Sequence, residues 1–163
     1  MTSGHDHENL QTDFRLLSIA DIEAIMPLVA DLNPDLDSSE LRNRLAEMFA
    51  YENYHCFGLF AGQELVAVSS GWLTTRLYSG RQLELDNVVV RPEWRNRGVG
   101  AVLNRQIEDW ARIHDCITCE LNSYVTNSGS HRFYFRQGYS ILGYHFYKRL
   151  DFCSLPAFPT DQD

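Results

Sequence analysis

The pattern of apolar and polar positions along the chain predicts a mixed α/β domain. Stretches rich in β-branched and aromatic residues predict strands, and stretches with apolar residues three and four positions apart predict helices. The predicted strands are residues 13–17, 55–61, 64–77, 82–90, 116–121 and 139–150, and the predicted helices begin at Ser18, at Asp37 or Ser38, at Gly98 and at Asn127. This order, βααβββαβαβ, is that of a domain in which strands and helices are intermixed.

Residue-level signals place the ends of several elements. Ser18 followed by Asp21 resembles a capping box at the start of the first helix, and Pro27 is expected to kink that helix. The Gly/Arg-rich stretch RPEWRNRGVG, residues 91–100, predicts a loop between the strand before it and the helix after it.

Size and composition are those of one globular domain. The chain has 163 residues, of which 44% are hydrophobic and 22% are charged. No apolar run reaches the roughly 18 residues of a membrane helix, and the first residues do not resemble a secretory signal, so a cytoplasmic protein without a membrane partner is expected. We expect a flexible N-terminus over residues 1–12, a folded domain over residues 13–150 and a C-terminal tail over residues 151–163.

The charge is unevenly distributed along the chain. The formal net charge is −8. Residues 1–64 carry twelve acids against three arginines, whereas residues 91–149 carry five acids against nine bases. An acidic chain argues against nucleic acid as a partner. The basic half is either a local site for a small polyanion or one of two solvated faces of unequal sign.

The cysteines and histidines do not predict a metal site. Cys116 and Cys119 have the spacing of a metal or redox pair, but on a strand these positions point to opposite faces of the sheet. The six histidines show no metal-binding spacing. Free thiols and no bound metal are therefore expected.

The passage from strand 82–90 through the loop into the next helix predicts an anion site. The first amides of a helix have no acceptor within the helix, and the helix dipole favours negative charge there. Gly98 and Gly100 let a ligand approach the backbone closely, and Arg91, Arg95 and Arg97 supply further donors. A pyrophosphate fits this pattern, although the loop lacks both the lysine of a P-loop and the third glycine of a dinucleotide fingerprint. The alternative is a helix start with two incidental glycines.

Two motifs in this order resemble those of the GNAT (Gcn5-related) acetyltransferase superfamily. The run Arg95-Asn96-Arg97-Gly98-Val99-Gly100 is similar to the family pattern R/Q-x-x-G-x-G/A, and residues 127–139 resemble its second motif, with Ser130 in the small position and Tyr134 as the motif tyrosine. The resemblance covers roughly residues 13–150. It implies a GNAT-like fold, with a central, mostly antiparallel mixed sheet of six to seven strands and about four helices.

The resemblance also implies acetyl-CoA as cosubstrate and assigns residues to it. By this likeness the loop holds the pyrophosphate of acetyl-CoA, backbone amides of Val88 and Val90 serve the developing oxyanion, and Asn127 and Ser130 contact the coenzyme arm. The full set of expected coenzyme-binding residues is Val88, Val89, Val90, Arg95, Asn96, Arg97, Gly98, Val99, Gly100, Ala101, Asn127, Ser130 and Tyr134.

Three side chains are candidates for proton transfer. A free alkylamine is almost fully protonated at neutral pH, so a base must remove its proton before it attacks a thioester. Glu84 is the candidate base, and Asp86 lies on the same face of the predicted strand and can share the task. Both could also attract a cationic substrate or simply face solvent. Tyr134 resembles the family's general acid, or else it is a half-buried helix residue. Asn87 departs from the family pattern, in which many relatives carry an acid.

Together these features predict an N-acetyltransferase that moves an acetyl group from acetyl-CoA to a primary amine, by direct attack in a ternary complex. The acceptor is expected to be a small molecule, because the segment after Ser130 further resembles bacterial enzymes that acetylate small amines, including aminoalkylphosphonate acetyltransferases. A protein lysine or N-terminal amine is the alternative acceptor, and a non-catalytic acyl-CoA-binding module is the alternative class. A homodimer is a further expectation, since relatives are commonly dimeric.

Overall fold

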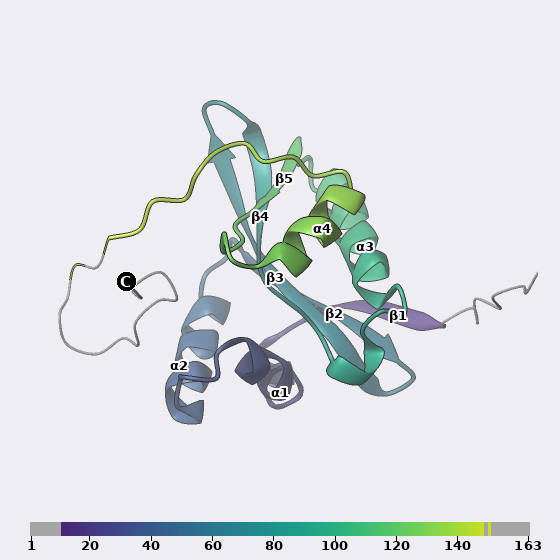
Figure 1. The fold of residues 1–163 in the computed structure, drawn as a ribbon. Helices are drawn as coiled ribbons and strands as arrows, with labels where there is room; N and C mark the ends of the chain where they lie inside the picture. The colour runs from purple at the N-terminus through teal and green to yellow at the C-terminus, as the bar shows by residue number, and fades with distance from the viewer. Residues whose placement is uncertain (1–10, 149, 151–163) are drawn as a thin grey trace, which may run out of the picture.

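A five-stranded sheet with the strand order β1-β2-β3-β4-β5 forms the centre of the protein (Figure 1). This computed structural model describes residues 11–148 and 150. Neighbouring strands are antiparallel from β1 to β4, and β5 pairs with β4 in parallel. The strands are β1 Thr12–Leu17, β2 Tyr54–Ala61, β3 Glu64–Arg76, β4 Gly80–Val90 and β5 Thr118–Leu121.

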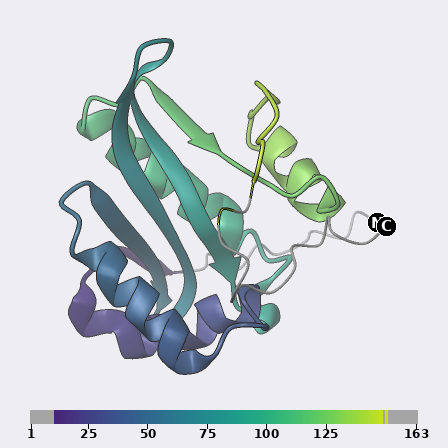
Figure 2. The ribbon, with the colours of Figure 1, turned by 90° about the vertical axis from the view of Figure 1, so that its left-hand side faces the viewer.

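Helices cover both faces of this sheet. Figure 2 shows α1 and α2 on the near side of the sheet and α3 behind it. None of the helices in the described part of the chain is long and apolar enough to cross a membrane. The helices are α1 Ile22–Leu32, α2 Ser38–Phe49, α3 Val99–Ile113 and α4 Ser128–Arg136, with short 3-10 turns at Ile19–Asp21 and Pro92–Trp94.

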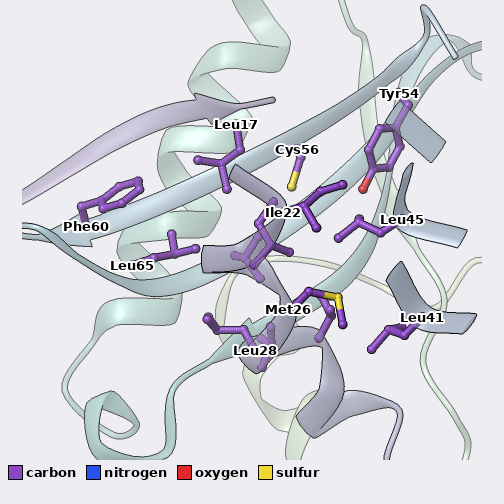
Figure 3. Close-up of a cluster of buried hydrophobic side chains, with 14 residues drawn as sticks. Leu17, Ile22, Met26, Leu28, Leu41, Leu45, Tyr54, Cys56, Phe60 and Leu65 are labelled. Atoms are coloured by element: carbon purple, nitrogen blue, oxygen red, sulfur yellow. The ribbon is translucent and has the colours of Figure 1, made fainter. Parts of the chain in front are cut away.

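One half of the core lies between the sheet and the first two helices (Figure 3). Apolar residues of α1 and α2 at helical spacing pack on side chains of β2 and β3, as the sequence pattern of the helices predicts. The labelled members of this cluster are Leu17, Ile22, Met26, Leu28, Leu41, Leu45, Tyr54, Cys56, Phe60 and Leu65. Each fully buried aliphatic side chain contributes roughly 1.5–3 kcal/mol to the free energy of unfolding. This cluster therefore holds α1 and α2 firmly on one face of the sheet.

The other half of the core lies under α3. Val99, Leu103, Ile107 and Trp110 form the buried stripe of this helix and pack against the opposite face of β2, β3 and β4. This packing anchors the start of α3 at the end of β4, which is the geometry that the candidate site requires.

The local signals of the sequence are largely confirmed. Ser18 and Asp21 form the capping box, with each side chain accepting a hydrogen bond from the backbone of the other. Asp37 rather than Ser38 caps α2 and accepts a hydrogen bond from the amide of Ser39. Helix α1 continues through Pro27.

The prediction of six to seven strands is wrong for the described residues, which form five. Residues 139–148 have the alternation of a strand but belong to no sheet. The physical reason is that alternation gives only a local preference, whereas a strand exists once its backbone pairs, and residues 139–148 pair with no strand of the described sheet. The expected N-terminus reaches into β1 at Thr12. Its residues 1–10, and the expected tail 151–163, lie outside the described residues.

Candidate active site

Strand β5 ends before β4 does, which leaves a gap in the sheet beside the second half of β4. Their pairing runs from Gln82 opposite Thr118 to Leu85 opposite Leu121, but β4 continues to Val90. The amide of Arg91 donates to the carbonyl of Val66 on β3 at 2.9 Å. Because amide directions alternate along a strand, the amides of Val90 and Val88 point away from β3 and into the gap. The side chain of Val89 is buried in the cluster under α1 and α2, on the face of the sheet opposite to the side chains of Val88 and Val90.

The start of α3 lies at the end of this gap. Gly98 precedes the helix with φ 79°, a left-handed conformation that glycine adopts without strain. The amides of the first turn, from Val99 to Ala101, have no acceptor within the helix. Asn96 also has a positive φ, of 60°, so the loop turns tightly just before these amides. Backbone donors and the positive end of the helix dipole therefore converge here.

The loop arginines have different tasks. Nε of Arg95 donates to the carbonyl of Val90 at 2.9 Å, and Nε of Arg91 donates to the carbonyl of Leu65 at 2.7 Å. Both side chains therefore brace the end of β4. The guanidinium of Arg97 lies over the ring of Trp94, 5.5 Å from its centroid.

Helix α4 closes the other side of the gap. The Oδ1 atom of Asn127 caps this helix by accepting from the amide of Ser130 at 3.1 Å. A Cβ atom at Gly100 would lie 3.4 Å from Cε2 of Phe133 and 3.6 Å from Cγ2 of Val90. The end of β4, the first turn of α3 and the middle of α4 therefore meet around Gly100.

Tyr134 presents a protonated phenol on α4. Its ring packs edge-on against Phe133 and Tyr139, with centroids 5.1 and 5.5 Å away. Burial raises the pKa of Tyr134 to about 12, so the proton stays on the hydroxyl at neutral pH. Within residues 11–148 no group forms a hydrogen bond with this hydroxyl, which leaves it available to a ligand.

Glu84 lies opposite Trp72 on β3 and opposite Glu120 on β5, one pair before the β4–β5 ladder ends. Its Oε2 atom lies 3.2 Å from Nη2 of Arg76, and its Oε1 atom accepts from Nδ2 of Asn122 at 3.3 Å. The carboxylate is thus held by two donors and is partly accessible to solvent.

Asp86 lies at a β-bulge, where Ser69 on β3 faces both Asn87 and Val88 on β4. Asn87 has φ 51°, and its amide donates to Oδ1 of Asp86 at 2.9 Å. The side chain of Asp86 reaches solvent, yet the surrounding protein volume displaces enough water to raise its pKa, and the charge of Glu84 raises the pKa further, against the lowering effect of the Asn87 amide. Asp86 is therefore a stronger base than an ordinary aspartate.

A pocket of 340 Å³ joins these two carboxylates to side chains from β3, from the connector after β5 and from the segment after α4. Its lining consists of Trp72, Glu84, Leu85, Asp86, Asn122 and His145. Its size is at the lower end of the range for small-molecule sites. The ring of Trp72 is fixed by Tyr51 and Tyr54, with centroids 5.7 and 4.9 Å away. The position of Trp72 could have been found by counting back from the hairpin turn at Tyr78, whereas nothing in the sequence pattern indicates His145.

The cysteines stand apart from this chemistry. Cys56, Cys116 and Cys119 are free, and burial raises the pKa of Cys56 to about 12 and that of Cys119 to about 11. Their thiols are therefore poor nucleophiles at neutral pH. Residues 11–148 hold no group of three or more histidine, cysteine or acidic side chains that could bind a metal ion.

A backbone gap that ends at an open helix start, beside an acidic pocket, is a suitable site for an anionic ligand next to a cationic one. The model of the acetyltransferase (GNAT) family matches residues 22–139, so this chain belongs to the GNAT acetyltransferase family. It is an acyl-CoA-dependent N-acetyltransferase, and acetyl-CoA is the cosubstrate.

Individual relatives agree with this assignment. The chain is 27% identical over 123 residues to the uncharacterized N-acetyltransferase YhdJ of Bacillus subtilis, a match that covers 75% of this chain and 87% of that protein. It is 26% identical over 140 residues to the aminoalkylphosphonate N-acetyltransferase of Salmonella typhimurium, with 85% and 91% covered. The structure of AAC(6')-Iy in complex with the bisubstrate analogue CoA-S-monomethyl-acetylneamine has the same fold, with a TM-score of 0.75 at 16% identity, covering 86% of this chain and 99% of that one.

Proposed function

We propose that this enzyme acetylates the primary amine of a small cationic molecule by direct attack within a ternary complex. The observation that carries the proposal is the continuity of β4: Glu84 and Asp86 line the acidic pocket, and Val88 and Val90 line the gap that begins at the next residues. An amine in the pocket and a thioester in the gap would therefore meet at the bulge. Acetyl-CoA supplies the activated acetyl group.

The chain offers a fitting set of donors for the coenzyme. The first-turn amides of α3 and the side chain of Arg97 would hold its pyrophosphate, with Asn96 and Gly98 giving the loop its shape. Asn127 and Ser130 at the start of α4 would border the pantetheine arm. The absence of a side chain at Gly100 supports this placement, because it lets Phe133 of α4 and the end of β4 lie against the first turn of α3.

Asp86 is the base that the geometry favours, with Glu84 as its partner. Glu84 already accepts from Arg76 and Asn122, whereas Oδ2 of Asp86 accepts no hydrogen bond from residues 11–148 and its raised pKa improves its basicity. Glu84 and the ring of Trp72 would hold the ammonium form, by charge and by cation–π attraction. Asp86 would then take the proton, directly or through one water.

Two further charges develop in the reaction, on the carbonyl oxygen and on the departing sulfur, and groups beside the gap would stabilise them. The amides of Val88 and Val90 would donate to the carbonyl oxygen as negative charge develops on it. The hydroxyl of Tyr134 would give its proton to the departing sulfur. The raised thiol pKa of Cys119 speaks against a covalent acetyl-enzyme.

A panel of amines scored by release of free thiol from acetyl-CoA tests this function. It should contain aminoalkylphosphonates, because of the relative from Salmonella, together with diamines, aminoglycosides and peptides that offer a lysine or an N-terminal amine. We expect small amines to be turned over with the highest kcat/KM. Preference for peptides would support the alternative protein acceptor, and tight coenzyme binding without transfer to any amine would support a non-catalytic module.

A further inference from the structure

Two buried serines interrupt the apolar run of β3 beside the bulge in β4. Residues 65–68 are apolar and buried, and Ser69 and Ser70 follow them with 0% and 1% of their surface exposed. A buried hydroxyl destabilises a protein unless it has a hydrogen-bond partner. Both hydroxyls donate to the same acceptor, the backbone carbonyl of Asp86, each at 3.2 Å. Because consecutive side chains of a strand lie on opposite faces of the sheet, the two hydroxyls hold this carbonyl from both sides.

The peptide group between Asp86 and Asn87 connects these serines to the candidate base. Its carbonyl oxygen accepts from the serines, and its amide donates to Oδ1 of the Asp86 side chain at 2.9 Å. The described chain contains no cis peptide bond, and in a planar trans peptide the carbonyl and the amide point in opposite directions. Fixing the carbonyl against β3 therefore directs the amide toward the carboxylate.

The side chain of Asn87 closes this network. Its Nδ2 atom donates to Oγ of Ser70 at 3.1 Å, so Ser70 accepts from Asn87 and donates to Asp86. The φ of Asn87, 51°, lies in the left-handed region, which asparagine adopts more readily than most residues. A carboxylate in this place could not donate to Ser70 and would compete with the Asp86 carbonyl for the serine proton. An asparagine at the bulge thus suits both its backbone conformation and its hydrogen bonds.

We propose that Ser70 and Asn87 are positioning residues, which orient the carboxylate of Asp86 for proton transfer. This inference rests on the proposed function, in which Asp86 is the base. Neither residue lines the acidic pocket, so both would act through Asp86 and not on the substrate. With Oδ1 held by the amide of Asn87, rotation of the carboxylate is restricted and its other oxygen keeps one direction. A base with a fixed direction transfers a proton faster than one that must first rotate into place.

Two substitutions, each with a matched control, test this role. Ser70→Ala removes the hydroxyl, and Asn87→Gly removes the side-chain amide while glycine keeps the positive φ without strain. Ser79→Ala is the control for the first, since it removes a half-buried hydroxyl that donates to Gln82 in the β3–β4 hairpin. Asp115→Gly is the control for the second, since Asp115 has φ 60° at the end of α3. Circular dichroism and calorimetric titration with CoA show whether each variant is folded.

We expect kcat to fall roughly 10-fold in Ser70→Ala and in Asn87→Gly, because the base is no longer held in one orientation. The amide of Asn87 lowers the pKa of Asp86, so loosening this contact should also move the acidic limb of the kcat profile to higher pH. Both controls should keep the kcat and the pH profile of the wild type. An acidic limb that stays in place in folded Ser70→Ala would overturn the proposal.

A double-mutant cycle separates positioning from a structural role. In the Asp86→Asn background, Ser70→Ala should cause no further loss of kcat, because its effect passes through Asp86. A full 10-fold loss in that background would overturn this inference and leave the proposed function standing. If Asp86→Asn alone kept the kcat of the wild type, Asp86 would not be the base, and that part of the proposed function would be overturned together with this inference.

Discussion

The side-chain amide of Asn122 donates a hydrogen bond to Oε1 of Glu84 at 3.3 Å, across the line at which β5 leaves β4. The connector after β5 is thereby tied to the acidic pocket, and the position of one pocket carboxylate depends on a residue that follows a different strand.

Removal of this contact should weaken acceptor binding. In Asn122→Ala, Glu84 keeps Arg76 but loses its second donor, so we expect KM for the amine to rise roughly 2- to 10-fold, with the coenzyme KM unchanged. Initial rates with each substrate varied in turn measure both constants. Equal changes in the two constants would contradict a role confined to the acceptor side.

The two carboxylates should differ in their effect on the pH profile. Asp86→Asn is expected to lower kcat roughly 100-fold and to remove the acidic limb of the profile, since the base itself is lost. Glu84→Gln should mainly raise KM for the amine and keep that limb. The pH dependence of kcat in both variants shows which carboxylate is the base. An acidic limb that persists in Asp86→Asn would assign the base to Glu84.

Asp86 also predicts a change of stability with pH. Its pKa is raised in the folded state, so the folded protein binds more protons here than the unfolded chain does, and stability falls as the pH rises through the interval between the unfolded value, near 3.8, and the folded value. Asp86→Asn should therefore melt at a slightly higher temperature than the wild type at pH 7. At a pH below the unfolded pKa of the aspartate, the two proteins should melt at the same temperature. The difference is small because the side chain reaches solvent. Thermal melts at the two pH values measure it.

Tyr134→Phe should separate catalysis from folding. The hydroxyl forms no hydrogen bond within residues 11–148 and is partly buried, so its removal is expected to leave the free energy of unfolding unchanged or slightly increased. The loss of the general acid should lower kcat roughly 100-fold. Urea unfolding and single-turnover kinetics test the two statements. Full activity in the folded variant would assign the proton donor to another group.

Substitution of Gly98 tests the coenzyme site, and the same substitution of Gly62 is its matched control. Both have positive φ, 79° and 62°, and at both the place that a Cβ atom would take is open space, but Gly62 lies in the distant β2–β3 turn. Gly98→Asp and Gly62→Asp should each cost about 1 kcal/mol of stability. Only Gly98→Asp places a charge against the pyrophosphate and should weaken coenzyme binding roughly 100-fold. Calorimetric titration with CoA measures this, and equal affinities in the two variants would refute the placement.

Most of the architecture could be predicted from the sequence, because the elements carry their own periodicity. The stripe of α3, the cap at Asp37 and the capping box at Ser18 are local features, and the structure has them where the pattern predicts them. Residues 139–148 show the limit of this reasoning, since their pattern is that of a strand but pairing depends on what lies beside them.

The site could be predicted only in part for a related reason. The loop from Arg95 to Gly100 is contiguous, so its motif is visible in the sequence. The acidic pocket is assembled from β3, β4, the connector after β5 and the last segment, and its members are far apart in the chain. Trp72 belongs to no motif, and its place in the site follows only from the strand register that sets it opposite Glu84.

The bulge at Asn87 limits how strand β4 can be altered in a redesign of this enzyme. Before it, Leu83 and Leu85 face α3, and after it Val88 and Val90 do, so odd positions give way to even ones within a single strand. Deletion of Asn87 would remove the bulge and leave Val88, Val89 and Val90 on their present faces, whereas a one-residue deletion elsewhere in β4 would turn the neighbouring side chains over and send core residues to the wrong face. Length changes introduced to alter substrate choice are therefore better confined to the β3–β4 hairpin tip, and this strand is best varied by substitution alone.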